Sequence, residues 1–283
     1  MSNPIPIDTE LAAPYPEDLY RFDQPGRYVE RFDQLTEADF RQFEELGYLA
    51  VRQLLTPDEV ADVLAGMASV LENPGEAMIQ YESWAVDRIG SATGEERLDL
   101  IRKFMTFIQE DERLTALARH DKIVSIVRRL CGTPDISMMQ DMALLKPPGG
   151  GREKPWHQDN AFFALEPGTP IVGVWIALDP ATPENGCMHV LPGTHREGPV
   201  VHFRRRDWQV CDDQVDRRRD TMIPLPPGGA LFFHGLLHHG TPTNRTDRRR
   251  RAIQLHYVPV GTPQISDRRR LDIFGSEGKD VTC

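Results

Sequence analysis

The spacing of hydrophobic residues predicts helices in the first half of the chain. Thr36 can cap a helix over residues 37–46 that Gly47 ends, and residues 48–55 have the composition of a strand. Residues 56–59, Thr-Pro-Asp-Glu, form a capping box with proline at the first helical position. The hydrophobic residues of the helix that follows fall on one face: Val60, Val63, Leu64, Met67 and Leu71. We expect the hydrophobic faces of these two helices to pack against another layer of secondary structure.

The second half of the chain has the pattern of short strands. After a third helical stretch, expected around residues 114–130, the hydrophobic runs become short and are separated by proline and glycine. The runs cover residues 137–146, 171–178, 188–191, 230–234 and 252–259. Short strands after a helical layer predict a mainly β protein: a double-stranded β-helix, or cupin-like jelly roll, with the N-terminal helical layer packed on one sheet.

The domain organisation is expected to be simple. Residues 1–34 are rich in Pro, Asp, Gln and Tyr without periodicity, so we predict an extended N-terminal arm that carries no chemistry. Residues 35–283 are predicted to form a single catalytic domain, a length that suits one jelly roll.

Composition narrows the class of protein. The hydrophobic fraction of 40% and the charged fraction of 27% are near the average for globular proteins. No stretch approaches the roughly 18 apolar residues that a membrane span needs, and the N-terminus lacks the basic start and apolar core of a signal peptide. We therefore expect a cytoplasmic protein without a membrane partner. The four cysteines form no CxxC motif and are expected to be reduced.

The net charge of -10 is unevenly distributed, because residues 201–283 carry 15 Lys and Arg against 10 Asp and Glu. Arginine triplets at 204–206, 217–219 and 268–270 are each flanked by aspartate. This pattern indicates ion-paired loops rather than a nucleic-acid surface. The expected partner is a small-molecule substrate, and the chain is expected to be a monomer or a homodimer.

One constellation suggests a metal site. His157 and Asp159 follow a Gly- and Pro-rich turn, and in an extended segment residues i and i+2 point the same way. With a histidine about eighty residues later they would form a 2-His-1-carboxylate site, which suits Fe(II) and leaves positions for a co-substrate and O2. A His-x-Asp motif alone is weak, because a surface hydrogen bond explains it equally well. Spacing also does not choose among His234, His238 and His239 as the third ligand.

Several short blocks resemble the phytanoyl-CoA dioxygenase family of Fe(II)- and 2-oxoglutarate-dependent dioxygenases. They are Lys146-Pro147-Pro148, His157-Gln158-Asp159, Val174-Trp175-Ile176-Ala177, Asn185-Gly186-Cys187, Leu191-Pro192-Gly193-Thr194-His195 and the segment from Phe233 to Ala252. They occur in the family's order and span roughly residues 100–258, and this ordered combination is far more specific than any single motif.

The resemblance implies roles for individual residues. The family's distal iron histidine precedes the glycine of a His-Gly-Ser/Thr turn, which selects His239 as the third iron ligand beside His157 and Asp159. The family's arginine for the distal carboxylate of 2-oxoglutarate lies eleven positions later, at Arg250. The resemblance also implies four further residues around 2-oxoglutarate: Thr241 as a hydroxyl donor, Met142 and Trp175 as walls, and Lys103.

Strand alternation supports Arg250 among its neighbours. Arg250 and Ala252 would face inward together and Arg251 outward, while Arg248 and Arg249 would belong to a solvated turn. A planar guanidinium suits a buried carboxylate better than an ammonium does.

The resemblance implies that the protein consumes 2-oxoglutarate and O2, releases succinate and CO2, and hydroxylates a small organic molecule. Asn160, Phe162 and Phe163 are candidate walls for that substrate, whose identity the family name does not settle. In a halogenase, chloride would occupy the position of the Asp159 carboxylate. The presence of Asp159 therefore argues against a halogenase. The same residues are compatible with a cupin-like metal-binding isomerase or with a catalytically silent family member, and succinate release separates both from the oxygenase.

Overall fold

Two facing sheets form the centre of the computed structural model, which describes residues 14–275. The larger sheet has the strand order β1-β2-β12-β7-β14-β5-β4-β3. Its strands are β1 (Val29–Arg31), β2 (Tyr48–Gln53), β3 (Met78–Tyr81), β4 (Ile101–Met105), β5 (Ile136–Lys146), β7 (Val172–Ala177), β12 (Ala230–His234) and β14 (Arg250–Pro259). The smaller sheet has the order β11-β8-β13-β6 and consists of β11 (Thr221–Ile223), β8 (Met188–Val190), β13 (His239–Thr241) and β6 (Lys154–His157).

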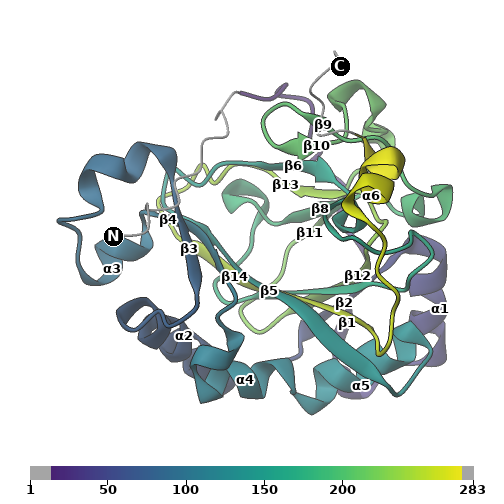
Figure 1. Cartoon of the computed structure of the whole chain (residues 1–283), viewed down its shortest axis with the longest axis horizontal. Coiled ribbons are helices and arrows are strands. Elements are labelled where there is room, and N and C mark those ends of the chain that lie inside the picture. The colour runs from purple at the N-terminus through teal and green to yellow at the C-terminus, as the bar shows by residue number, and fades with distance from the viewer. Residues whose placement is uncertain (1–13, 276–283) are drawn as a thin grey trace.

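The two sheets lie one above the other, with a short hairpin beyond the smaller sheet (Figure 1). The hairpin consists of β9 (Phe203–Arg204) and β10 (Trp208–Gln209). This arrangement confirms the predicted jelly roll.

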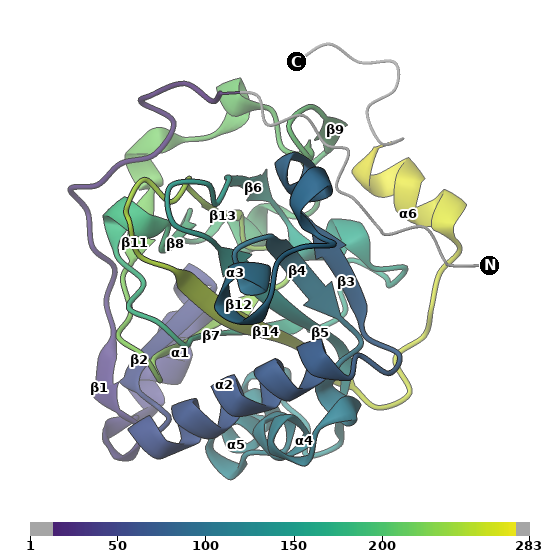
Figure 2. The same cartoon turned by 90° about the vertical axis from the view of Figure 1, so that its left-hand side faces the viewer.

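Helices cover the outer face of the larger sheet (Figure 2). They are α1 (Glu37–Leu46), α2 (Pro57–Glu72), α4 (Glu112–Ala118) and α5 (Asp121–Cys131), while α3 (Gly94–Leu98) and α6 (Asp267–Phe274) lie elsewhere. Single 3-10 turns fill several connections: Phe32–Gln34, Ser83–Arg88, Ile108–Glu110, Asp159–Phe162, Pro183–Asn185, Thr194–Glu197, Asp212–Gln214 and Arg217–Arg219.

Alternation along β7 shows how the larger sheet serves two layers. Val174 and Ile176 belong to the core that the helices share with the sheet. Trp175 and Ala177 belong to a second core between the two sheets. Because successive strand residues point to opposite faces, one strand supplies both a helix-packed face and a wall of the interior.

The first two predicted helices are confirmed with their caps. Gly47 ends α1 with φ +81°, a conformation that glycine adopts without strain. At the start of α2, Thr56 Oγ1 accepts from the Glu59 amide at 3.2 Å, and Glu59 Oε2 accepts from the Thr56 amide at 2.7 Å. The capping box predicted at this position therefore forms.

The stretch around residues 114–130 is helical as predicted, but two helices occupy it instead of one. α4 ends at Ala118, and His120 caps α5 by accepting from the Lys122 amide at Nδ1. The Tyr257 hydroxyl donates to the Ala118 carbonyl at 2.8 Å, which satisfies a group at the end of α4. Hydrophobic periodicity continues through the break and therefore did not reveal it.

All five predicted hydrophobic runs are strands, but three strands of the larger sheet were missed: β1, which lies within the stretch predicted to be an extended arm and pairs with β2, and also β3 and β4. β3 and β4 pair with each other, and β4 pairs with β5 through contacts such as Phe104 with Ala143. β4 contains Arg102 and Lys103 in succession, so it lacks a clean alternation of polar and hydrophobic residues.

Other expectations have mixed outcomes. Cys211 is disulfide-bonded, so the expectation that all four cysteines are reduced is wrong, while Cys131 and Cys187 are free. Arginines of the triplets form the expected ion pairs, such as Arg206 with Glu153 and Arg219 with Glu197.

Within residues 14–275 no helix is long and apolar enough to cross a membrane. The division into an arm over residues 1–34 and one domain over 35–283 stays a prediction, since its outer ends lie outside the described residues.

Candidate metal centre and co-substrate pocket

A cavity of about 330 Å³ lies between the two sheets, and residues from both sheets line it. His157 is the last residue of β6 and His239 the first of β13, and the two are register partners in the smaller sheet. Asp159 starts the 3-10 turn directly after β6. A Cβ on Gly240 would lie 3.0 Å from the Lys154 carbonyl oxygen, so glycine beside His239 permits the close approach of β13 to β6.

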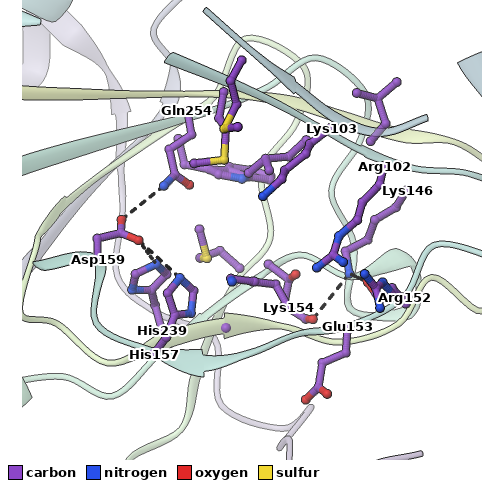
Figure 3. Close-up of a pocket in the computed structure, with 18 of the residues that line it drawn as sticks. Arg102, Lys103, Lys146, Arg152, Glu153, Lys154, His157, Asp159, His239 and Gln254 are labelled. Atoms are coloured by element: carbon purple, nitrogen blue, oxygen red, sulfur yellow. Dashed lines mark hydrogen bonds and ion pairs between the residues drawn. The ribbon is translucent and has the colours of Figure 1, made fainter. Parts of the chain in front are cut away.

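His157, Asp159 and His239 form a buried cluster with the geometry of a metal site. One ligand atom from each residue lies within 4.8 Å of the others. Asp159 Oδ1 is 3.3 Å from His157 Nε2 and 3.5 Å from His239 Nε2. Figure 3 shows the two imidazoles and the carboxylate converging at one side of the cavity. Two histidines and one carboxylate are the donor set that non-haem iron prefers.

Backbone carbonyls orient both imidazoles. His157 Nδ1 lies 2.8 Å from the Pro155 oxygen, and His239 Nδ1 lies 2.9 Å from the Leu237 oxygen. A carbonyl can only accept, so Nδ1 carries the proton in each ring and the Nε2 lone pair faces the carboxylate. Burial, with a further contribution from neighbouring His239, lowers the pKa of His157 to about 4. His157 is therefore neutral, the form that binds metals, at neutral pH.

Gln254 and His256 hold the other carboxylate oxygen. His256 Nε2 lies 2.7 Å from Asp159 Oδ2, and Gln254 Nε2 donates to the same oxygen at 3.2 Å. Burial alone would raise the pKa of Asp159, but His239 and His256 hold it well below its usual range. Both contacts were missed at the sequence level. Continuing the alternation from Arg250 and Ala252 by two more steps places both side chains in the interior, but it does not indicate that they contact Asp159.

Arg250 lies inside the cavity as a buried cation. It is 2% exposed, its guanidinium lies 5.4 Å from the centre of the Trp175 ring, and Nη1 donates to the Leu144 carbonyl at 3.3 Å. Its Nε is buried and has no hydrogen-bond partner. Burial lowers the pKa of Arg250 to about 10, so the group stays charged at neutral pH. A buried guanidinium with an unsatisfied N–H fits a carboxylate ligand.

The neighbouring arginines differ from Arg250. Arg251 forms an ion pair with Asp179 at 2.7 Å, on the opposite face of the strand as alternation requires. Arg248 is exposed. Arg249 is half-buried and its Nε lies 2.6 Å from Asp99, so the prediction that it is solvated is wrong. Asp99 lies 150 residues away in the chain, and local sequence gave no indication of it.

The structure places most of the other predicted site residues in the same cavity. Four expected around 2-oxoglutarate line it: Lys103, Met142, Trp175 and Thr241. Phe162 and Phe163 also line it. Asn160 does not belong to the lining. Its amide donates to the Gly235 carbonyl and its side chain to the Pro167 carbonyl, so it joins two loops and is not a wall of the cavity.

Comparison with known proteins agrees with this site. Residues 43–252 match the family described as phytanoyl-CoA dioxygenase (PhyH). The peroxisomal phytanoyl-CoA dioxygenase of Rattus norvegicus is 32% identical over 240 residues, which cover 79% of this chain and 68% of the relative. A probable phytanoyl-CoA dioxygenase of Caenorhabditis elegans is 28% identical over 82% of this chain and 78% of its own length.

Solved structures share the fold. EvdO2 from Micromonospora carbonacea var. aurantiaca, complexed with 2-oxoglutarate, has a TM-score of 0.62 at 24% identity and covers 83% of this chain and 94% of its own. The non-heme alpha ketoglutarate dependent carbocyclase SnoK has a TM-score of 0.64 at 22% identity, covering 91% and 97%. Together with the family match and the buried triad that shares a cavity with Arg250, these findings establish the class of enzyme. The chain belongs to the phytanoyl-CoA dioxygenase family and is a non-haem iron, 2-oxoglutarate-dependent dioxygenase.

Proposed function

We propose that this dioxygenase hydroxylates an unactivated C–H bond of a small organic molecule and releases succinate and CO2. One observation carries the proposal: the buried cluster of two histidines and a carboxylate shares a cavity with a buried arginine. No ion pair joins Arg250 to an acidic residue in the described part of the chain. A metal site and a site for a small anion would therefore share one cavity.

His157, Asp159 and His239 would hold the iron. When bound, iron with 2-oxoglutarate and O2 supplies the oxidising power for C–H cleavage. The chain contributes the positions of the ligands: carbonyl oxygens direct each histidine Nε2 toward the ion, and His256 and Gln254 fix the carboxylate. A site whose ligands are already oriented loses little entropy when the metal binds.

Arg250 would bind the distal carboxylate of 2-oxoglutarate. Thr241 would donate its hydroxyl to the same group, and Trp175 and Met142 would cover the carbon chain. Lys103 would add positive charge near this site. Trp175 is fully buried and Arg250 nearly so, which keeps water from competing for the guanidinium.

Phe162 and Phe163 would contact the substrate. Phe163 is buried, whereas Phe162 is 39% exposed and stands edge-on to His157, with ring centroids 5.6 Å apart. A cavity of about 330 Å³ is near the lower end of ligand pockets, which range over roughly 300–1,000 Å³. After 2-oxoglutarate binds, the remaining space suits a small substrate or one end of a larger one.

A substrate panel with anaerobically loaded Fe(II) and 2-oxoglutarate tests this proposal after exposure to ¹⁸O2. A hydroxylase should form succinate in proportion to a product that carries one ¹⁸O atom. Structural neighbours include an epimerase and a carbocyclase, so succinate with a product lacking ¹⁸O would favour chemistry of those kinds. Product without succinate would favour a cupin-like isomerase. Failure to bind 2-oxoglutarate would indicate a catalytically silent protein.

A further inference from the structure

The cavity is rich in positive charge, although the whole chain has a net charge of -10. Among the described residues that line it, six side chains are basic: Arg102, Lys103, Lys146, Arg152, Lys154 and Arg250. Three are acidic: Glu82, Glu153 and Asp159. The charges of iron(II) and the 2-oxoglutarate dianion would cancel each other, so their binding leaves the surplus of basic over acidic side chains in place. A surplus that the co-substrate does not neutralise favours a negatively charged substrate.

Lys154 occupies a position suited to such a substrate. Its ammonium nitrogen lies 4.7 Å from the centre of the Phe162 ring, and it adds to the positive charge around the iron ligand His157. About a third of its side chain is exposed, like that of Phe162. Both residues therefore lie where the cavity opens to solvent. Figure 3 shows the Lys154 side chain between the triad and the group of Arg102, Lys146 and Arg152.

The ion pair of Lys154 leaves room for another anion. Its ammonium contacts Asp207, and the same carboxylate oxygen of Asp207 lies 3.4 Å from Arg102. One carboxylate thus lies between two cations. The other oxygen of Asp207 accepts from the Trp208 amide at 2.7 Å. An ammonium has three N–H groups, so Lys154 can donate to an incoming oxyanion while its contact with Asp207 persists.

We propose that the substrate is a small organic anion whose charged group binds Lys154 at the mouth of the cavity. Its hydrocarbon part would contact Phe162 and Phe163 and present a C–H bond to the metal site. This inference rests on the proposed function, because it assumes that the substrate enters the cavity that holds iron and 2-oxoglutarate. A carboxylate, a sulfonate and a phosphate monoester share the required chemistry.

Binding to the anaerobic holoenzyme, loaded with Fe(II) and 2-oxoglutarate, tests the proposal. The probes are straight chains of four to eight carbons that end in a carboxylate, sulfonate, phosphate, primary amide or primary amine, and binding is measured by calorimetry. At least one anionic series should bind more tightly than its amides, and the preferred series identifies the charged group. Lys154→Gln should weaken that binding about tenfold, and Lys154→Arg should restore most of it. Lys154→Glu should shift the preference toward the amines.

Two further variants complete the test. Arg205→Gln removes one positive charge from an exposed residue of the neighbouring hairpin, outside the cavity lining, and should leave anion binding nearly unchanged. Asp207→Asn removes the competing carboxylate and should tighten anion binding several-fold, which keeps the proposal testable even if Lys154→Gln folds poorly. Equal binding of amides and anions, no binding of any anion, or equal losses at Lys154 and Arg205 would each overturn it. Failure to form the visible absorption of the Fe(II)–2-oxoglutarate complex would instead count against the proposed function.

Discussion

The two ends of the cavity differ in how their buried polar atoms are paired. At the metal end, formed by His157, Asp159 and His239, carbonyls hold both imidazoles and two side chains hold the carboxylate. At the arginine end, formed by Arg250 and Lys146, the hydrogen bonds that the two side chains donate go to carbonyl oxygens, and the Arg250 guanidinium also lies over the Trp175 ring. Lys146 donates to the carbonyls of Arg152 and Pro242, and Arg250 Nε has no partner.

This difference separates a site that is already organised from one that needs a ligand. Burial of a cation without a counterion is unfavourable, and burial lowers the pKa of Lys146 well below its usual range. Binding of a carboxylate at the arginine end would offset that cost, whereas the metal end has its hydrogen bonds already in the absence of an ion. We therefore expect 2-oxoglutarate to stabilise the fold by mass action, to an extent set by its concentration relative to its dissociation constant.

The largest expected effect is at the metal end. His239→Ala removes one of three ligands, so the protein should lose tight iron binding and turnover should fall below detection. Iron content after anaerobic loading and succinate formation are the measurements. His238→Asn, at the adjacent buried histidine outside the triad, is the matched control and should retain iron. Full turnover by the His239 variant would eliminate the triad as the iron site.

At the arginine end, Arg250→Ala should raise the Michaelis constant for 2-oxoglutarate roughly thirtyfold or more, as expected for a loss of about 2 to 5 kcal/mol. Without 2-oxoglutarate the variant should melt no lower than the wild type, because it has lost a buried cation without a counterion. The rise in melting temperature on adding 2-oxoglutarate should largely disappear.

Arg248→Ala is the control for this experiment, since Arg248 is exposed, and it should change neither quantity. Arg251→Ala and Arg249→Ala should lower stability instead, because each breaks an ion pair, with Asp179 and Asp99 respectively. A larger effect on the Michaelis constant at Arg251 than at Arg250 would contradict the assigned face of β14.

Glu82, an acidic residue that lines the same cavity and lies 3.6 Å from Arg152, gives a pH-dependent test. Burial raises the pKa of Glu82 from 4.5 to about 7. The folded state then binds more protons than the unfolded state between these values, so stability should fall as pH rises from about 4.5 to about 7 and level off above. At about 1.4 kcal/mol per pH unit, this gap corresponds to about 3 kcal/mol. Urea unfolding at pH 5 and pH 8 should show Glu82→Gln gaining relative stability at pH 8. The same comparison for exposed Glu45→Gln should show no such gain.

How much of the molecule was predictable depends on whether the cause is local in sequence. The helix caps at Thr56 and Gly47 and the alternation that selects Arg250 depend on nearby residues, and sequence reasoning found them. The break at His120 and the partner Asp99 of Arg249 depend on contacts made across the fold. Pairing between strands far apart in sequence brings these residues together, and no local pattern encodes it.

The two polar residues that hold Asp159 are an intermediate case. Gln254 and His256 lie on the same face of β14 as Arg250, so alternation places them in the interior. Alternation does not say what they contact there. Their contact depends on the position of Asp159, which follows β6 and precedes His256 by 97 residues in the chain. The two residues meet because the two sheets face each other.

His256 provides the mildest test of the organised metal end. A carboxylate can only accept, so His256 Nε2 donates to Asp159 Oδ2 at 2.7 Å and leaves Oδ1 beside the two histidines. Loss of a residue that orients a ligand typically costs 10- to 100-fold in metal affinity. His256→Leu should therefore weaken Fe(II) binding by about this factor, less than loss of a ligand does. His256→Gln, which can still donate an N–H, should recover part of the affinity.

Competition with a metal chelator under anaerobic conditions measures these affinities without requiring a substrate. Gln254→Leu should have a smaller effect than His256→Leu, because its hydrogen bond to Asp159 is longer at 3.2 Å and His256 would remain. Melting temperatures of the apoproteins distinguish a misplaced carboxylate from a damaged core, since His256 also packs edge-on against Phe163. If His256→Leu folds and binds Fe(II) as tightly as the wild type, the hydrogen bond from His256 to Asp159 does not contribute to the affinity for Fe(II). The metal end would then be no better organised before ligand binding than the arginine end.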